Sequence, residues 1–136
     1  MKAEEIMTPR PQYIEANRSI REALEKMLEF DVRHLPVLRD SELVGMISDR
    51  DVRDFALPLT EEFDDLGDIH ARLSSNVTEV MRTDLVTVSP QGDLAELVDL
   101  FIDEKLDAVA VVDPIEDGLI GIISYIDILK GVRDNI

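Results

Sequence analysis

The stretch GMISDRD, residues 45–51, occurs a second time in related form as GIISYID, residues 121–127. Each copy predicts a short apolar strand that leads into an amphipathic helix, with a serine and an aspartate three residues apart where the helix begins. The first turn of a helix has backbone N–H groups that find no partner inside the helix. The two copies therefore predict two polar helix starts, each suited to a ligand that carries both hydroxyl and phosphate groups.

The residues around the two copies also repeat, which indicates an internal duplication. Met7 aligns with Met81 at a shift of 74 residues, and Gly45 aligns with Gly121 at a shift of 76 residues. The change of shift lies in a polar turn between two apolar runs, where a structural repeat tolerates an insertion. Each half reads as strand, helix, strand, strand, helix. The predicted strands are residues 13–14, 35–38 and 43–47 in the first half and 85–88, 109–112 and 119–123 in the second.

The first helix of each half has a recognisable start. Ser19 followed by Glu22 forms a capping-box pattern, and the apolar residues after it keep the spacing of one helix face. Asp93 followed by Glu96 predicts the same cap in the second half. The second helix of each half begins at the serine of the repeated stretch.

These elements predict a mixed α/β (α+β) fold of two β-α-β-β-α repeats. The apolar runs are continuous rather than alternating, so we expect their strands to be buried on both faces. A half of about 55 residues is marginal on its own, and the simplest arrangement packs the two halves through their sheets with pseudo-twofold symmetry. The predicted boundaries are residues 1–58 for the first repeat, 59–76 for a partly helical acidic connector and 77–136 for the second repeat. We interpret the acidic residues of the connector as a solvated face: Glu61, Glu62, Asp64, Asp65 and Asp68.

Charge and composition exclude several classes of protein. A formal net charge of -16 disfavours a nucleic-acid surface, and 4% aromatic residues without tryptophan disfavour a base-stacking platform. The chain has no cysteine and only two histidines, neither in a catalytic motif, so we expect no enzyme and no metal centre. No apolar run reaches about 18 residues and the N-terminus has no signal-peptide core. We expect a cytoplasmic protein without membrane contact.

The serine and aspartate of the repeated stretch have a second interpretation. Ser48 with Asp51, and Ser124 with Asp127, are close to a capping box and can act only to stabilise a helix start, by roughly 0.5–2 kcal/mol. Against this, the turn recurs in both halves after glycine and two apolar residues, and both copies have aspartate where the box more often has glutamate or glutamine. Both interpretations remain open at this point.

The whole chain, from about residue 4 to residue 132, resembles a tandem pair of cystathionine-beta-synthase (CBS) domains, also called a Bateman module. The resemblance rests on VRHLPV at residues 32–37, on the two repeated stretches, and on the short segments EIM at residues 5–7 and EVM at residues 79–81. It implies adenosine binding in clefts between the two repeats. By this analogy Asp51 and Asp127 accept hydrogen bonds from the two ribose hydroxyls, because a carboxylate can accept from two donors at once.

The resemblance also implies roles for neighbouring residues. Ser48 and Ser124 would donate to ribose or to the first phosphate, and the base would rest near residues 35–36 and 109–110. The second repeat has Asp107 and Ala108 where the first has Arg33 and His34. We therefore expect one cleft to bind phosphate better than the other. The predicted ligand-binding residues are Ser48, Arg50, Asp51, Ser124 and Asp127 for ribose and phosphate, and Arg33, His34, Leu35, Pro36, Thr87, Val109 and Ala110 for base and phosphate.

The function implied is a regulatory ligand-sensing module that signals by conformational change. Its ligand would be an adenine nucleotide such as AMP, ADP or ATP, or S-adenosylmethionine, with any Mg²⁺ carried by the nucleotide and no obligatory cofactor. The resemblance suggests a homodimer formed through helices, and a separate regulated protein as partner. The alternative is a protein-interaction scaffold whose clefts bind no nucleotide and whose serine–aspartate turns act only as helix caps.

Overall fold

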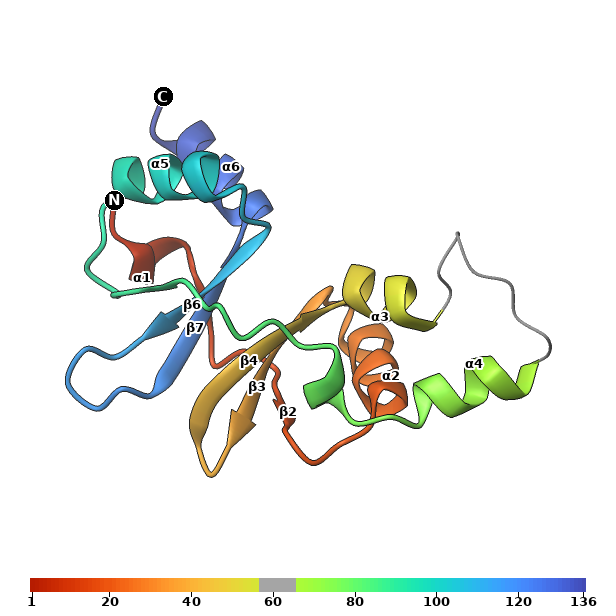
Figure 1. The fold of residues 1–136 in the computed structure, drawn as a ribbon. Coiled ribbons are helices and arrows are strands. Elements are labelled where there is room, and N and C mark those ends of the chain that lie inside the picture. The colour runs from red at the N-terminus through yellow and green to blue at the C-terminus, as the bar shows by residue number, and fades with distance from the viewer. Residues whose placement is uncertain (57–65) are drawn as a thin grey trace. The chain divides into compact units, whose positions relative to one another are not determined.

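The computed structural model describes residues 1–56 and 66–136, and it confirms the mixed α/β class with one sheet in each repeat (Figure 1). The chain divides into two compact units. The central unit is the continuous stretch Gln12–Asp84, and the terminal unit combines Met1–Pro11 with Leu85–Ile136. Four acidic residues of the predicted connector lie outside the described residues: Glu61, Glu62, Asp64 and Asp65.

The central unit has a three-stranded sheet in the order β2-β3-β4. The short β2 is parallel to β3, and β3 forms an antiparallel hairpin with β4. Helices α2 and α3 follow β2 and β4 along the chain, and α4 occupies the described part of the predicted connector. The bounds are β2 Ile14–Glu15, α2 Ile20–Phe30, β3 His34–Arg39, β4 Glu42–Ser48, α3 Asp49–Ala56, α4 Leu66–Leu73 and a 3-10 turn at Val77–Glu79.

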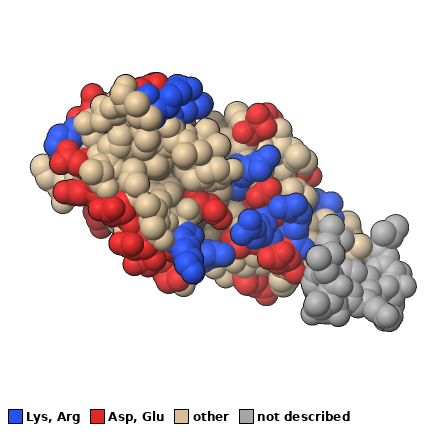
Figure 2. Space-filling model, turned by 90° about the horizontal axis from the view of Figure 1, so that it is seen from above, with Lys and Arg blue, Asp and Glu red and all other residues tan. Residues whose placement is uncertain are grey.

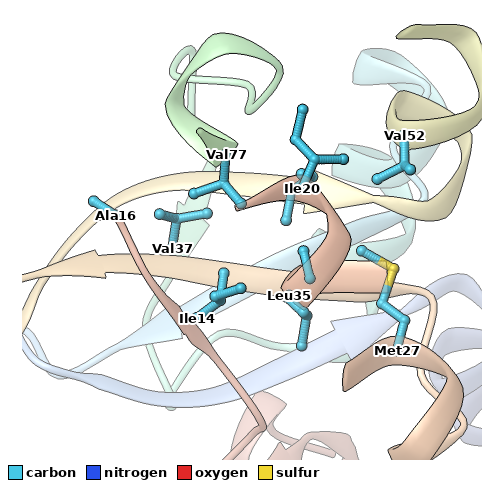
Figure 3. Close-up of a cluster of buried hydrophobic side chains, with 10 residues drawn as sticks. Ile14, Ala16, Ile20, Met27, Leu35, Val37, Val52 and Val77 are labelled. Atoms are coloured by element: carbon cyan, nitrogen blue, oxygen red, sulfur yellow. The ribbon is translucent and has the colours of Figure 1, made fainter. Parts of the chain in front are cut away.

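The core of the central unit lies between its sheet and its helices. Leu35 and Val37 of β3 are fully buried and pack with Ile20 and Met27 of α2, as Figure 3 shows. Val77, which follows α4, is also fully buried in this core. The predicted continuous burial holds in β3, where four consecutive residues from Leu35 are buried. In β7 of the other unit burial alternates instead.

The terminal unit has a four-stranded sheet in the order β1-β7-β6-β5. The parallel pair β5-β6 and the hairpin β6-β7 repeat the pattern of the central unit, and β1 adds an antiparallel edge strand. The bounds are α1 Ala3–Ile6, β1 Thr8–Pro9, β5 Thr87–Val88, α5 Leu94–Glu104, β6 Ala108–Val112, β7 Leu119–Ser124 and α6 Tyr125–Asp134. A second buried core is built from these elements, with Ala3, Leu97, Val111 and Ile123 among its members.

The two units exchange their leading segments, which we define as residues 1–11 and residues 75–84. The first segment packs in the terminal unit, where Met7 lies so close to Gly121 that a Cβ on this glycine would be 2.9 Å from Met7 Cγ. The second packs in the central unit, where a Cβ on Gly45 would be 2.9 Å from Met81 Cγ. Glycine at the start of each repeated stretch therefore admits the methionine that precedes the opposite repeat in the sequence.

The two predicted helix caps differ. Ser19 caps α2 as expected, because its hydroxyl accepts from Glu22 N at 3.1 Å and Glu22 Oε2 accepts from Ser19 N at 3.2 Å. The expected cap by Asp93 and Glu96 is wrong, although Asp93 is the residue before α5. The Asp93 carboxylate instead accepts a hydrogen bond from Lys2 Nζ at 2.9 Å, and the Met1 carbonyl accepts from the first backbone N–H of α5 at 2.9 Å. Residues of the first leading segment thus provide the hydrogen-bond partners at the N-terminal start of α5.

Candidate functional site: the two serine–aspartate turns

The first turn joins β4 to α3 in the central unit. Asp51 Oδ2 accepts from Ser48 N at 3.0 Å, and Ser48 Oγ accepts from Asp51 N at 3.1 Å. These reciprocal bonds form a capping box in which aspartate takes the place of the usual glutamate. The cap holds the carboxylate in one position, with its side chain 13% exposed.

The second turn joins β7 to α6 in the terminal unit with the same bonds. Asp127 Oδ2 accepts from Ser124 N at 2.9 Å, and Ser124 Oγ accepts from Asp127 N at 3.3 Å. The Ser124 hydroxyl also lies 3.2 Å from the same carboxylate oxygen and donates to it. The capping interpretation is therefore realised in both halves, and a ligand would bind to turns whose polar groups are already held in place.

The surroundings of the first turn are cationic. The Arg33 carbonyl accepts from Asp49 N at 3.0 Å, and His34 pairs with Ser48 across the β3–β4 hairpin. Arg33 is exposed beside the turn, and so is Arg50 on the first turn of α3. Figure 2 shows Lys and Arg side chains gathered over this part of the central unit. The predicted residues Arg33, His34, Ser48, Arg50 and Asp51 are thus brought together in one unit.

Arg82 is a further cation at this turn that the sequence reasoning missed. It lies on the second leading segment and is hydrogen-bonded to Met46 of β4 through both backbone groups, at 2.8 and 3.0 Å. Its Nε is 3.5 Å from Asp51 Oδ1. In the sequence, Arg82 directly follows Met81 of the repeated EVM segment, and this position was the only indication of a role. Arg82 reaches Asp51 because its segment packs in the central unit.

The surroundings of the second turn differ at the matching positions. The Asp107 carbonyl takes the place of Arg33 and accepts from Tyr125 N at 3.0 Å, while Ala108 pairs with Ser124 in the place of His34. Thr8 of β1 pairs with Ile122, which is the relation that Arg82 has with Met46. An aspartate, an alanine and a threonine thus stand where the first turn has two arginines and a histidine.

The residues predicted for base binding lie on the strands beside each turn. Leu35 and Val109 are members of the two buried cores, so their side chains are already packed. Pro36 and Ala110, the next residues along, are buried but belong to neither core. Thr87 is exposed on β5 and pairs with Ala110. Leu35, Pro36, Val109 and Ala110 thus expose almost no side-chain surface in this structure, and Thr87 is the exposed residue of the set predicted for base binding on these strands.

A hollow of about 290 Å³ lies elsewhere in the central unit. It is near the β3–β4 turn, at the opposite end of β3 from His34, and includes none of the predicted site residues. Its lining residues are Glu15, Ala16, Asn17, Arg18, Arg39 and Asp40. The described residues also contain no group of three or more His, Asp or Glu side chains placed to hold a metal ion. None of the described helices is long and apolar enough to cross a membrane.

The fold and the paired turns define a tandem CBS domain. The CBS domain family model matches residues 3–58 and 77–134, so the chain belongs to this family and contains two copies of the domain. The CBS domain-containing protein YhcV of Bacillus subtilis (strain 168) is 30% identical over 129 residues, which cover 95% of this chain and 84% of that protein. Two further relatives are matched over only 44% and 20% of their own length.

Two solved structures are similar to the whole chain. CBSX2 in complex with AMP has a TM-score of 0.80 and 25% sequence identity, and the match covers 98% of this chain and 97% of that one. A CBS domain-containing protein of unknown function from Bacillus anthracis str. Ames Ancestor has a TM-score of 0.83, with 100% and 95% covered. Its identity of 20% supports the fold alone.

Proposed function

We propose that the protein is a regulatory module that binds an adenosine-containing nucleotide at its two serine–aspartate turns and signals by conformational change. The observation that carries this proposal is the pair of half-buried carboxylates, Asp51 and Asp127, each held at a helix start by the same reciprocal bonds. Membership of the CBS family and the AMP bound to CBSX2 support the class of ligand. AMP, ADP, ATP and S-adenosylmethionine share the adenosine group that these turns would bind.

The chemistry of a diol fits a carboxylate in this position. An ionised carboxylate accepts hydrogen bonds at two oxygens, so each aspartate can accept from ribose hydroxyls while its cap stays formed. A hydrogen bond to a charged group contributes about 1.5–3 kcal/mol, which is roughly one to two decades in affinity. Ser48 and Ser124 lie at the starts of α3 and α6, where the positive end of the helix dipole favours a phosphate.

The overall charge of the chain opposes this binding at long range. A formal net charge of -16 repels an anionic ligand, and only local cations reverse the sign near a turn. Arg33, Arg50 and Arg82 supply them at the first turn, and Mg²⁺ carried by the nucleotide would add to them. We therefore expect modest affinity and a clear dependence on salt.

Regulation rather than catalysis suits this chain. The sequence has no cysteine nucleophile, and the two aspartates belong to separate turns where each would be occupied with ribose. A ligand shifts a conformational equilibrium only as far as it binds one conformation better than the other. The chain would pass that shift to a regulated protein or to a second copy of itself.

A second copy is a suitable partner for the helices of the terminal unit. Ile102 of α5 is 66% exposed, and Ile126 and Leu129 of α6 are 42% and 60% exposed. Figure 2 shows a broad surface without charged residues over these helices. Monomeric proteins rarely expose continuous apolar surfaces of this kind, which supports a homodimer formed through this face.

Calorimetric titration with AMP tests the proposal. Asp51→Asn and Asp127→Asn keep a carbonyl oxygen for the cap but lose the charge, and each should weaken binding at its own turn about 10- to 100-fold. Ser19→Ala is the matched control, because it removes a cap of the same type from α2 and should leave AMP binding unchanged. If neither aspartate variant alters binding, or if AMP, ATP and S-adenosylmethionine all fail to bind, the protein is better described as an interaction scaffold.

A further inference from the structure

Arg82 is held in a fixed position next to the first turn. Its backbone N–H and carbonyl both bond to Met46 of β4, so the base of its side chain moves only with the sheet. The guanidinium reaches Asp51 with Nε 3.5 Å from Oδ1, yet 68% of the Arg82 side chain is exposed. The group that contacts the carboxylate is thus free to turn away into solvent.

This contact makes the two carboxylates unequal. Asp51 uses Oδ2 for Ser48 and has the Arg82 guanidinium against Oδ1, so both oxygens have a partner. Asp127 makes both of its bonds to Ser124 through Oδ2. Within residues 1–56 and 66–136, Asp127 Oδ1 has no hydrogen-bond or ion-pair partner.

To bind both hydroxyls of a ribose, the carboxylate needs an oxygen whose lone pairs are not already used by another donor. At Asp127 it finds Oδ1 unoccupied. At Asp51 it must compete with the guanidinium for Oδ1, and a released guanidinium needs a new acceptor. A phosphate on the same ligand provides that acceptor, because arginine binds phosphate oxygens through charge-assisted bonds. An unphosphorylated nucleoside does not.

We propose that Arg82 is a specificity-determining residue that makes the first turn selective for phosphorylated nucleotides over nucleosides, whereas the second turn lacks this selectivity. The inference rests on the proposed function and names which ligands each turn accepts. Exchange of partners is feasible because an exposed ion pair is weak, while a guanidinium–phosphate contact near a helix start is stronger. The arginine comes from the leading segment of the second repeat, so the second repeat sets the ligand choice at the first.

The test measures AMP and adenosine by calorimetry on the full chain carrying Asp127→Asn, so that the first turn dominates the signal. In this background Arg82→Gln should weaken AMP binding about tenfold and leave adenosine unchanged or up to about fivefold tighter. The ratio of the adenosine Kd to the AMP Kd should therefore fall at least tenfold. Arg18→Gln is the control, since it removes another exposed arginine of the central unit, one that pairs with Glu22, and should leave the ratio unchanged.

The reverse experiment installs the arginine at the second turn. Thr8 is exposed on β1 and has the same register relative to Asp127 that Arg82 has relative to Asp51. In the Asp51→Asn background, Thr8→Arg should raise the adenosine-to-AMP ratio at the second turn about tenfold. If AMP binds but neither substitution changes the ratio, the role of Arg82 is wrong and the proposed function stands. If AMP, ATP and S-adenosylmethionine all fail to bind the unsubstituted chain, both are wrong.

Discussion

The two serine–aspartate turns share a backbone and a cap but differ in almost every side chain around them. The first turn has Arg33 and Arg82 beside it, and the second has Asp107 and Thr8 at the same places. The helices that follow the turns differ in the same way. At two matching exposed positions, α3 has Arg50 and Arg53 where α6 has Ile126 and Leu129. Duplication has kept the helix start and changed its surface, toward anions in one copy and toward apolar contact in the other.

The largest expected effect is on self-association through the terminal unit, when a charge is placed on the exposed apolar face of α6. Leu129→Lys should weaken self-association at least about a hundredfold, because the proposed symmetric dimer would lose two leucines from its interface at about 1.5–3 kcal/mol each. Sedimentation equilibrium measures the change. Arg53→Ala is the control at the matching position of α3, and it should leave the association constant unchanged. A dimer that persists with Leu129→Lys would exclude this face as the interface.

The contacts between glycine and methionine provide a second comparison. Gly45→Ala and Gly121→Ala should each cost about 1–3 kcal/mol of unfolding free energy by overpacking. The extent to which a change in the neighbouring methionine relieves this overpacking should differ between the two units. All three atoms nearest to a Cβ at Gly121 belong to the flexible Met7 side chain, but at Gly45 the Arg82 carbonyl oxygen is also 3.1 Å away.

Double-mutant cycles in urea measure this relief. Met7→Ala should recover most of the cost of Gly121→Ala as coupling energy, whereas Met81→Ala should recover only part of the cost of Gly45→Ala. Equal coupling in the two cycles would contradict the structural difference between the two contacts.

The smallest effect concerns the starts of α2 and α5. Ser19 lies beside Asn76 and caps its own helix, while Asp93 lies beside Lys2 and pairs with it. The hydrogen bond from Lys2 lowers the pKa of Asp93 below its ordinary 3.8, and the same bond raises the pKa of Lys2 above its ordinary 10.5. Both groups are exposed, so the pair contributes little to stability.

The pH window of this contribution follows from the two shifts. Because the pKa of Asp93 is lower in the folded state, its share is present above pH 3.8 and is lost as the pH falls through the folded value. Because the pKa of Lys2 is higher in the folded state, its share is present below pH 10.5 and is lost as the pH rises through the folded value. Thermal melts of Lys2→Met and the unsubstituted chain should differ slightly at neutral pH and converge at both extremes. A difference that does not depend on pH would indicate that the ion pair is not its cause.

The sequence predicts most of the fold because the determining patterns are local. The repeated stretch, the apolar runs and the box of Ser19 with Glu22 each lie within a few residues, and the structure has the strands and the α2 cap where these patterns predict them. The error at Asp93 has a long-range cause, since its partner Lys2 is 91 residues away. Local helix-capping preferences cannot predict a contact between residues so far apart in the sequence.

The same limit applies to the candidate site. The serine and aspartate of each turn are recognised from their spacing, and the structure brings Arg33 and His34 to the first turn through hairpin pairing. The place of Arg82 beside Asp51 was not predicted, because the sequence of the short segment 75–84 does not indicate which of the two sheets it joins. Its place becomes visible only when residues 75–84 are seen to pack in the central unit.

The exchange of leading segments has a consequence for synthesis on the ribosome. Residues 12–84 form one uninterrupted unit and can fold as soon as they emerge. Strand β1 emerges before them, but Thr8 pairs with Ile122, so β1 can join its sheet only after residue 122 has been made. We expect docking of this strand to be the last step, since the longest loop closes latest. Pro9 suits such a delay, because a proline at a sheet edge lacks the N–H that would pair with a wrong neighbouring strand.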